Sequence, residues 1–210
     1  AITITINGAN DTPTVSAIAD ASTNEDAAYS FNASTSFSDV DGDTLTYSAT
    51  LSNDSALPSW LSINSSTGVL SGTPANGDVG AIAIKVTATD SQSASVSDTY
   101  TLTVANTNDA PIVSSAISDA FTNEDVPYSY DASQNFSDTD VGDTLTYSAT
   151  LSSGSALPSW LSINSSGVLS GTPTNDDTGI YNITITATDS GNATASDTFY
   201  LLVNQVNDAP

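Results

Sequence analysis

Asn106-Thr107-Asn108-Asp109-Ala110-Pro111 is the stretch that decides how this 210-residue chain is organised, because near copies of it recur at regular intervals. Asn10-Asp11-Thr12-Pro13 stands near the start, and Asn207-Asp208-Ala209-Pro210 closes the sequence. The spacing is roughly 100 residues, the size of one small domain. Each copy follows a strand-like run and ends in a proline, which cannot donate to a sheet ladder. The stretch therefore predicts junctions between tandem domains.

The sequence between these junctions is repeated almost word for word. Phe37–Thr50 recurs as Phe136–Thr150 with one residue inserted, and Ala56–Asn64 recurs as Ala156–Asn164. The alternating run Ile2, Ile4 and Ile6 is of the kind that precedes each later junction. We therefore predict the last strand of a preceding repeat at residues 1–9, repeat 1 at 10–108, repeat 2 at 109–207 and the start of the next linker at 208–210.

The pattern of apolar residues predicts an all-β fold. Thr, Ser, Val and Ile dominate, turn residues recur about every 8–12 positions, and no stretch has a helical period. Along 82–88, Ile82, Ile84, Val86 and Ala88 share one face, as in a half-buried antiparallel strand. The strands of repeat 1 are expected near residues 15–19, 28–32, 44–51, 60–63, 68–71, 81–89 and 95–105. The chain is thus predicted to form two tandem β-sandwiches of about seven strands each, immunoglobulin-like in architecture.

Composition excludes several classes of function. The chain holds 24 acids and one base, Lys85, for a formal net charge of −23. Such an excess argues against nucleic acid and anionic membranes as partners and favours multivalent cations. There is no apolar run long enough to insert into a membrane. Because Cys and His are absent, thiolate metal sites and the usual nucleophile–base pairs cannot be built, so we expect no enzyme activity. Disorder, the alternative for so acidic a chain, conflicts with the regular alternation.

Strand parity locates the acids at the ends of each predicted sandwich. If the strands of repeat 1 run alternately down and up, Glu25 and Asp78 lie at the end where the chain leaves. Asp39, Asp41 and Asp90 then lie at the end where the chain enters. If two repeats are stacked, the end where the chain leaves repeat 1 would lie against the end where the chain enters repeat 2. The candidate ligands of that central junction are Glu25, Asp78, Asn106, Asn108, Asp109, Asp138, Asp140 and Asp189.

Such a cluster of carboxylates without Lys or Arg would repel itself strongly unless a cation is bound. Calcium takes six to eight oxygen ligands from carboxylates, amides and carbonyls, whereas zinc would require His or Cys. An isolated Asp such as Asp20 or Asp54 is instead expected to satisfy a turn. Asp39, Asp41 and Asp43 mimic the start of an EF-hand loop, but position twelve is Thr50, so we reject an EF-hand. Further candidate ligands, at the flanking junctions, are Asn10, Asp11, Asp39, Asp41, Asp90 and Glu124, and Asn10-Asp11 and Asn207-Asp208 are expected to be half-sites.

These pieces, taken in order, resemble the cadherin-like repeats of dystroglycan type in bacterial proteins, which are related to the immunoglobulin-like repeats of large surface proteins. The resemblance rests on Glu25, Asp39-Val40-Asp41, Ala88-Thr89-Asp90 and Asn106–Pro111, with their counterparts in repeat 2. Trp60–Ile63 and Gly68–Pro74 are typical of the bacterial branch. The resemblance implies calcium between successive domains, and it implies the ligand positions Glu25, Asn106, Asn108, Asp109, Asp138, Asp140 and Asp189. The Asp-Arg-Glu motif of animal cadherins is absent, with Gly77-Asp78 and Asp176-Asp177 in its loop, so one to three ions per junction are expected.

The sequence thus predicts a calcium-binding, rod-forming extender of a large bacterial adhesin or surface protein, secreted or at the cell surface. Its partners would be neighbouring repeats of the same chain, and we expect a monomer. The alternative is a calcium-dependent carbohydrate-binding module of a secreted polysaccharide-acting enzyme, with polysaccharide as partner. Trp60 and Trp160 could then stack on sugar rings, although packing of each Trp against its sandwich is the simpler expectation.

Overall fold

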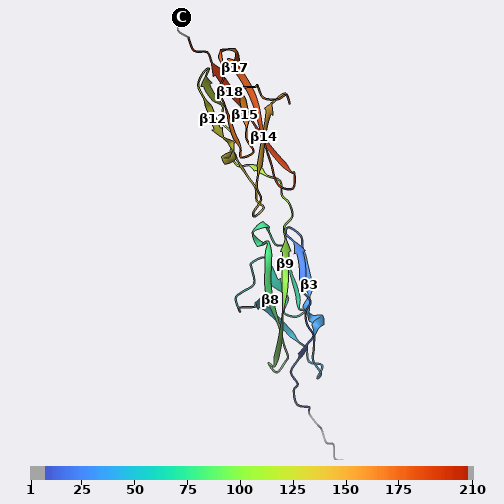
Figure 1. Ribbon diagram of the computed structural model, residues 1–210. Helices are drawn as coiled ribbons and strands as arrows, with labels where there is room; N and C mark the ends of the chain where they lie inside the picture. The colour runs from blue at the N-terminus through green and yellow to red at the C-terminus, as the bar shows by residue number, and fades with distance from the viewer. Residues whose placement is uncertain (1–7, 208–210) are drawn as a thin grey trace, which may run out of the picture. The chain divides into compact units, whose positions relative to one another are not determined.

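The structure, a computed structural model, describes residues 8–207, which form two compact units that divide between Thr107 and Asn108 (Figure 1). Each unit holds nine strands and two short 3-10 helices. The strand predicted from Ile2, Ile4 and Ile6 and the linker predicted at 208–210 lie outside the described residues. Between residues 8 and 207, no helix is long and apolar enough to cross a lipid bilayer.

The elements of unit 1 follow one another closely along the chain. They are β1 (Thr14–Val15), β2 (Ala21–Asn24), β3 (Tyr29–Asn32), η1 (Ala33–Ser36), β4 (Phe37–Ser38), β5 (Thr46–Leu51), β6 (Leu61–Ile63), β7 (Val69–Gly72), η2 (Asn76–Asp78), β8 (Gly80–Thr89) and β9 (Ser95–Ala105).

Unit 2 repeats this order element by element. Its elements are β10 (Ile112–Val113), β11 (Ala120–Asn123), β12 (Tyr128–Asp131), η3 (Ala132–Asn135), β13 (Phe136–Ser137), β14 (Thr146–Leu151), β15 (Leu161–Ile163), β16 (Val168–Gly171), η4 (Asn175–Asp177), β17 (Gly179–Thr188) and β18 (Thr194–Asn204).

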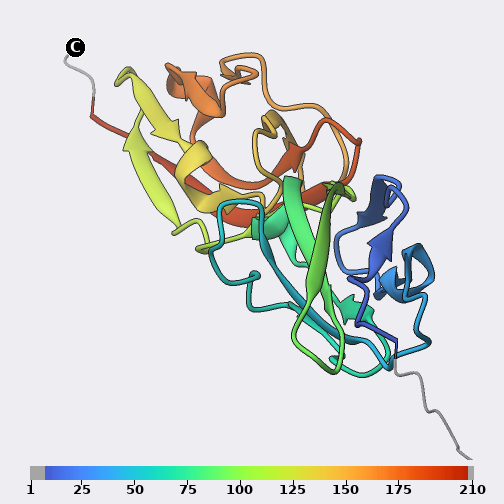
Figure 2. The same cartoon turned by 90° about the horizontal axis from the view of Figure 1, so that it is seen from below.

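Each unit is a sandwich of a four-stranded and a three-stranded sheet. The order is β2-β9-β8-β5 and β3-β7-β6 in unit 1, and β11-β18-β17-β14 and β12-β16-β15 in unit 2. The long strands β8 and β9 lie side by side in both views (Figure 1 and Figure 2). All pairings are antiparallel except β2 with β9 and β11 with β18, which are parallel. The all-β prediction is confirmed.

Each unit has nine strands rather than about seven, because the first strand of each repeat is broken in two and because a further two-residue strand, β4 or β13, pairs with the first of the two pieces. In unit 1, β1 pairs with β4, and β2 pairs with β9 in the four-stranded sheet. Two aspartates hold the segment between them: Asp98 accepts a hydrogen bond from the Ile18 backbone N–H (2.7 Å), and Asp20 accepts one from the Thr101 N–H (2.7 Å). These side chains satisfy backbone groups that a continuous strand would pair in a ladder.

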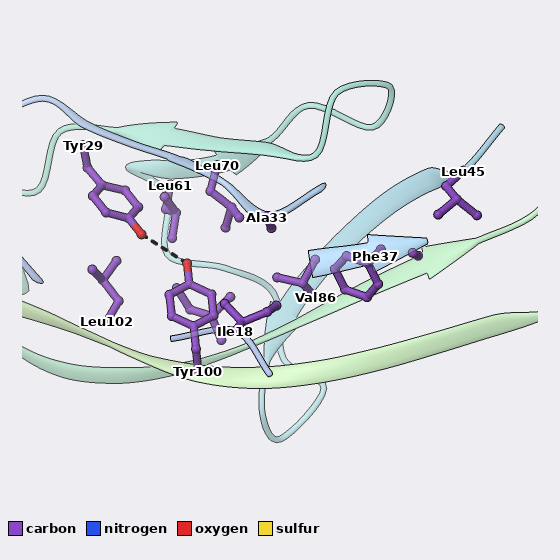
Figure 3. Close-up of a cluster of buried hydrophobic side chains, with 12 residues drawn as sticks. Ile18, Tyr29, Ala33, Phe37, Leu45, Leu61, Leu70, Val86, Tyr100 and Leu102 are labelled. Carbon is purple, nitrogen blue, oxygen red and sulfur yellow. Dashed lines mark hydrogen bonds between the residues drawn. The ribbon is translucent and has the colours of Figure 1, made fainter. Parts of the chain in front are cut away.

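The core of unit 1 lies between the two sheets, with side chains from both layers meeting in Figure 3. As the alternation predicted, Ile84, Val86 and Ala88 are fully buried. Tyr29 and Tyr100 approach from opposite layers and share a hydrogen bond between their hydroxyls (3.3 Å; Figure 3). Burial raises the pKa of both tyrosines.

Unit 2 lacks this hydroxyl pair, because Phe199 stands where unit 1 has Tyr100. The hydroxyl of Tyr128, the counterpart of Tyr29, is therefore buried without a hydrogen-bond partner. Burial, with a smaller contribution from Tyr130, raises the pKa of Tyr128 to about 12. An unsatisfied buried hydroxyl costs stability. Unit 2 therefore has a destabilising feature that unit 1 avoids through the hydrogen bond between Tyr29 and Tyr100.

Both tryptophans are half-buried and pack against the cores of their units, as the simpler expectation had it. The ring of Trp160 lies edge-to-face with Tyr181, with centroids 5.7 Å apart. The carbonyl of Trp160 is so close to Gly171 that a Cβ at this glycine would overlap it. The same holds for Trp60 and Gly72 in unit 1.

Candidate metal centres

The candidate ligands of unit 2 meet at the end where the chain enters the sandwich. Asp189 directly follows β17, and residues 138–143 form the loop between β13 and β14. The pairing of Thr146 with Thr188 places that loop and Asp189 at the same end of the sheet. The strands thus hold these acids in fixed positions.

Hydrogen bonds tie the junction motif to these acids. The Asn108 side-chain amide donates to Asp189 Oδ2 (3.0 Å), and the Asp109 backbone N–H donates to Asp140 Oδ2 (2.9 Å). The Asp140 N–H in turn donates to Asp138 Oδ1 (2.9 Å). One oxygen of Asp138 and one of Asp140 are therefore used to position the site, and both oxygens of Asp189 are, because its Oδ1 accepts from the Ala193 N–H (2.8 Å).

The second oxygens of Asp138 and Asp140 have no such partners. Oxygens of Asp138, Asp140 and Asp143 lie within 4.8 Å of one another. Asp140 is only 7% exposed, and both its Oδ1 and Asp138 Oδ2 are buried without a hydrogen-bond partner. A hydrogen bond from Ser190 lowers the pKa of Asp143 and so favours its charged form. Three carboxylates at this spacing repel one another unless a cation lies between them.

Unit 1 repeats the arrangement at its own entry end. The Asn10 amide donates to Asp90 Oδ2 (2.8 Å), and the Asp11 N–H donates to Asp41 Oδ2 (2.7 Å). The bond from Asn10 is the main cause of the lowered pKa of Asp90. In the loop, Asp39 Oδ2 and Asp43 Oδ2 are buried without a partner. Both repeats thus tie the junction motif to their acids in the same way, although the loop oxygens without partners differ: those of Asp39 and Asp43 in unit 1, and those of Asp138 and Asp140 in unit 2.

A second kind of site lies at the exit end of each unit. Glu25 and Glu124 are each only 2% exposed. Glu25 Oε1 accepts from the Thr107 N–H (2.7 Å), and Glu124 Oε1 accepts from the Val206 N–H (2.6 Å). The Oε2 atom of each glutamate is buried without a partner. Each unit therefore carries one deeply buried carboxylate beside the chain that leaves it.

Three predicted ligands have a different environment. Asp78 lies at the same end as Glu25, but its Oδ2 accepts from the Ala75 N–H (3.0 Å) and so caps the turn of η2. Asn106 is exposed directly after β9. Asn207 is exposed, and Asp208 lies outside the described residues. Glu25 belongs to unit 1, whereas Asp138, Asp140 and Asp189 belong to unit 2.

The donor set fits calcium. Among the nine buried side-chain polar atoms without partners in residues 8–207, six are carboxylate oxygens of the candidate sites. The chain's single base, Lys85, pairs with Asp54, so no basic side chain compensates these carboxylates. Hard, partly buried carboxylate and amide oxygens are the ligands that Ca²⁺ prefers.

Sequence reasoning left out Asp43 and Asp143, which the structure places among the acids of the loops. In the sequence, Asp43 was considered only as part of an EF-hand loop, which was rejected, and Asp143 is its counterpart in repeat 2. Their signal is that a third acid follows Asp-x-Asp in both copies, although Val141 is inserted in the second.

Comparisons with solved structures show the fold. The chain matches a three-domain fragment of human CDH23 (EC21-23; 18% identity, TM-score 0.64), with 94% of this chain and 71% of that chain covered. It also matches Drosophila N-cadherin EC1-4 (14% identity, TM-score 0.63) and human protocadherin-24 EC1-2 (19% identity, TM-score 0.56). These cover 93% and 96% of this chain, and 50% and 100% of theirs.

The chain also matches the endo-fucoidan hydrolase MfFcnA4, of which it spans 30%, at 24% identity and a TM-score of 0.39, too low to support an argument. No curated protein matches the chain. The family model described as "Putative Ig domain" matches residues 12–105 and again residues 110–204, almost the whole chain. The chain therefore belongs to the Putative Ig domain family, as two tandem members with a cadherin-like fold.

Proposed function

We propose that the chain is a calcium-binding, rod-forming extender segment of a large secreted or bacterial surface protein, with a structural rather than catalytic role. The observation that carries this proposal is the set of buried carboxylate oxygens without partners. Each unit has three of them, and two of the three are at equivalent positions in both copies: Glu25 and Glu124, and Asp39 and Asp138. A buried charge without a partner is costly, so a fold that repeats it has a ligand for it.

The residues that would hold calcium gather at each end. At an entry end the oxygens without partners belong to the loop that contains Asp-x-Asp and the third acid after it: Asp39 and Asp43 in unit 1, and Asp138 and Asp140 in unit 2. The aspartate that follows the long strand, Asp90 or Asp189, accepts hydrogen bonds at both oxygens and would contribute through a remaining lone pair. A calcium ion at an entry end would supply positive charge that neutralises the cluster. At an exit end, Glu25 and Glu124 present one free oxygen each.

The chain between the two units supports a role in stiffening. Glu25 holds Thr107, and Asp140 holds Asp109, so only Asn108 lies between two anchored residues. Two residues of chain span at most about 7 Å. Cations that fix the carboxylates on both sides would therefore leave little freedom in the linker, and a row of such repeats would form a stiff spacer.

Small-angle X-ray scattering with calcium and with chelator tests this role. We expect calcium to increase the maximum dimension and reduce interdomain flexibility, and Asp138→Asn with Asp140→Asn to abolish that change while both sandwiches stay folded. Asp176→Asn is the matched control, because this acid takes the place of Gly77 in repeat 1 and lies outside the site. Identical scattering with and without calcium would refute the calcium-locked rod.

A second candidate function is calcium-dependent carbohydrate binding, and one observation favours it. A hollow of about 570 Å³ adjoins the acids of unit 2 and is lined by Asp138, Asp140, Asp143 and Tyr147, with several Ser and Thr hydroxyls. Glycan-array binding that requires calcium and is lost in Tyr147→Ala would support this candidate. Trp160→Ala tests the predicted tryptophan platform separately.

A further inference from the structure

The outer face of the four-stranded sheet of unit 2 carries an exposed apolar patch. It consists of Phe121, Ile180, Tyr200 and Leu202, which are 75%, 70%, 51% and 38% exposed. Together with Asp119 and Ala120 they line a shallow hollow of about 450 Å³. We call these four residues the apolar patch. It has no part in the candidate metal centres.

The sheet register assembles the patch from three neighbouring strands. Leu202 pairs with Phe121 on one side and with Ile180 on the other, so these three form a row across β11, β18 and β17. Tyr200 lies in the next row, paired with Asn182. Their neighbours Leu201 and Val203 face the core, so the pleat points the patch away from the sandwich.

Repeat 1 provides an internal comparison, because its sheet has the same register without the patch. At the equivalent positions it carries Ser22, Ala81, Thr101 and Thr103. The fold therefore does not need apolar side chains there. The apolar side chains of repeat 2 therefore have a role that repeat 1 does not share.

The strands of this face are neutral around the patch, and the nearest carboxylate is that of Asp119, which lies at the edge of the hollow and accepts a hydrogen bond from the Tyr200 N–H (2.8 Å). Thr184 and Thr198 share a hydrogen bond between their hydroxyls (2.9 Å), and so do Thr186 and Ser196 (2.8 Å). No outward-facing residue of strands β11, β14, β17 and β18 is charged, in a chain with a net charge of −23. In repeat 1 the position of Thr184 is taken by Lys85, which pairs with Asp54. An apolar centre with a neutral polar rim is the composition of an interface core.

We infer that the apolar patch docks against the same patch of a second copy of the chain. The four side chains expose roughly 450 Å² per copy, which lies within the range of the largest patch on a typical monomer, a patch that is often functional. Two copies would bury roughly 900 Å² of apolar surface. That is close to the apolar share of a standard interface of about 1,600 Å².

The lack of charge on the strands of this face also favours a second copy of the chain over a basic partner. A basic partner would be recognised by an acidic rim, which the strands of this face lack. A second copy, by contrast, brings another face whose strands are neutral, so the like charges near the contact are limited to Asp119 of each copy, at the edge of the hollow. Two twisted sheets pack face to face at about −30°, and a twofold axis makes one patch complementary to itself. The proposed dimer would form through repeat 2 and differs from the monomer that the sequence led us to expect.

Sedimentation equilibrium of the full chain over about 10 µM to 1 mM tests the inference directly. We expect a concentration-dependent dimer whose association constant rises severalfold between about 0.05 and 0.5 M salt, because salt screens the repulsion between two acidic chains. Grafting the residues of repeat 1 (Phe121→Ser, Ile180→Ala, Tyr200→Thr, Leu202→Thr) should abolish the dimer. A monomer at every concentration, or an unchanged dimer in the graft, would overturn the inference.

A second readout does not depend on that multiple substitution. The chain has no cysteine, so Asn182→Cys at the edge of the patch introduces a unique thiol. Under mild oxidation this variant should form a disulfide-linked dimer much faster than the matched control Ala83→Cys in repeat 1. Equal rates would contradict docking through the patch. Association that weakens with salt would show that opposite charges hold it together, and it would also overturn the inference.

Discussion

Replacing Glu25 by Gln should change the stability of unit 1 in opposite directions with and without calcium. The carboxylate is 2% exposed, its Oε1 accepts from Thr107, and its Oε2 has no partner. Without calcium, this is a buried charge compensated by one hydrogen bond. Gln keeps the acceptor for Thr107 and removes the charge. We expect a gain of about 1 kcal/mol in the free energy of unfolding, because an unsatisfied buried group costs about 1–3 kcal/mol and more when charged.

With calcium the sign reverses. Sites of extracellular modules have dissociation constants of about 0.1–1 mM, so about 10 mM calcium is a 10- to 100-fold excess. Mass action then stabilises the native state by about 1.4–2.7 kcal/mol per ion, and the variant loses most of this increment. For a unit of this size, 1 kcal/mol corresponds to about 4–8 °C in the melting temperature. Glu25→Gln should therefore melt about 5 °C higher than wild type in chelator and about 5 °C lower in calcium.

The assay follows unit 1 alone by fluorescence of Trp60 in a Trp160→Phe background, since each unit holds one tryptophan. Glu124→Gln, observed through Trp160 in a Trp60→Phe background, provides the equivalent measurement in unit 2. A shift of the same sign in chelator and in calcium would refute the reasoning, because it would mean that the free oxygen of Glu25 is not a cation ligand.

Three further predictions concern stability. Tyr128→Phe should raise the free energy of unfolding of unit 2 by about 1 kcal/mol in urea titrations. Tyr29→Phe breaks a hydroxyl pair and should lower the free energy of unfolding of unit 1 by a similar amount. Changes of the same sign in the two variants would contradict this. Asp131 caps η3, and hydrogen bonds from Ser133 lower the pKa of its carboxyl group. The stabilisation of the folded state by the ionised carboxylate is therefore present above pH about 3.9 and is lost as the pH falls through the lowered pKa. Asp131→Asn should therefore give a flatter profile of melting temperature between pH 7 and 3, and parallel profiles would be evidence against this. Gly171→Ala should destabilise unit 2 by about 3 kcal/mol or more because of overlap with the Trp160 carbonyl, while Gly77→Ala, with open space around it, should leave thermal melting of unit 1 unchanged.

The sequence predicted the β-sandwich pair because alternation and turn signals are local properties of the chain. The broken first strand was missed for a physical reason. Its break depends on Asp20 and Asp98, which are far apart in the sequence and bond backbone groups of each other's segments. No local pattern reports such bonds. The apolar patch was missed as well, since Phe121 and Tyr200 read as ordinary strand residues until the register places them together.

Strand parity was enough to place the acids at the correct ends of each unit, as the Asn10–Asp90 and Asn108–Asp189 bonds show. Parity could not separate free from engaged oxygens. Asp78 turned out to cap a turn, whereas Asp143 joined the acids of the loop. That distinction depends on side-chain hydrogen bonds, which the sequence leaves open.

Isothermal titration of the full chain with calcium is the measurement that tests the central claim most directly. The account predicts saturable binding with dissociation constants of about 0.1–1 mM and a stoichiometry above one ion per chain. It predicts fewer ions in the Asp138→Asn, Asp140→Asn variant, with the control Asp176→Asn unchanged. No heat beyond dilution, or full stoichiometry in the double variant, would contradict it.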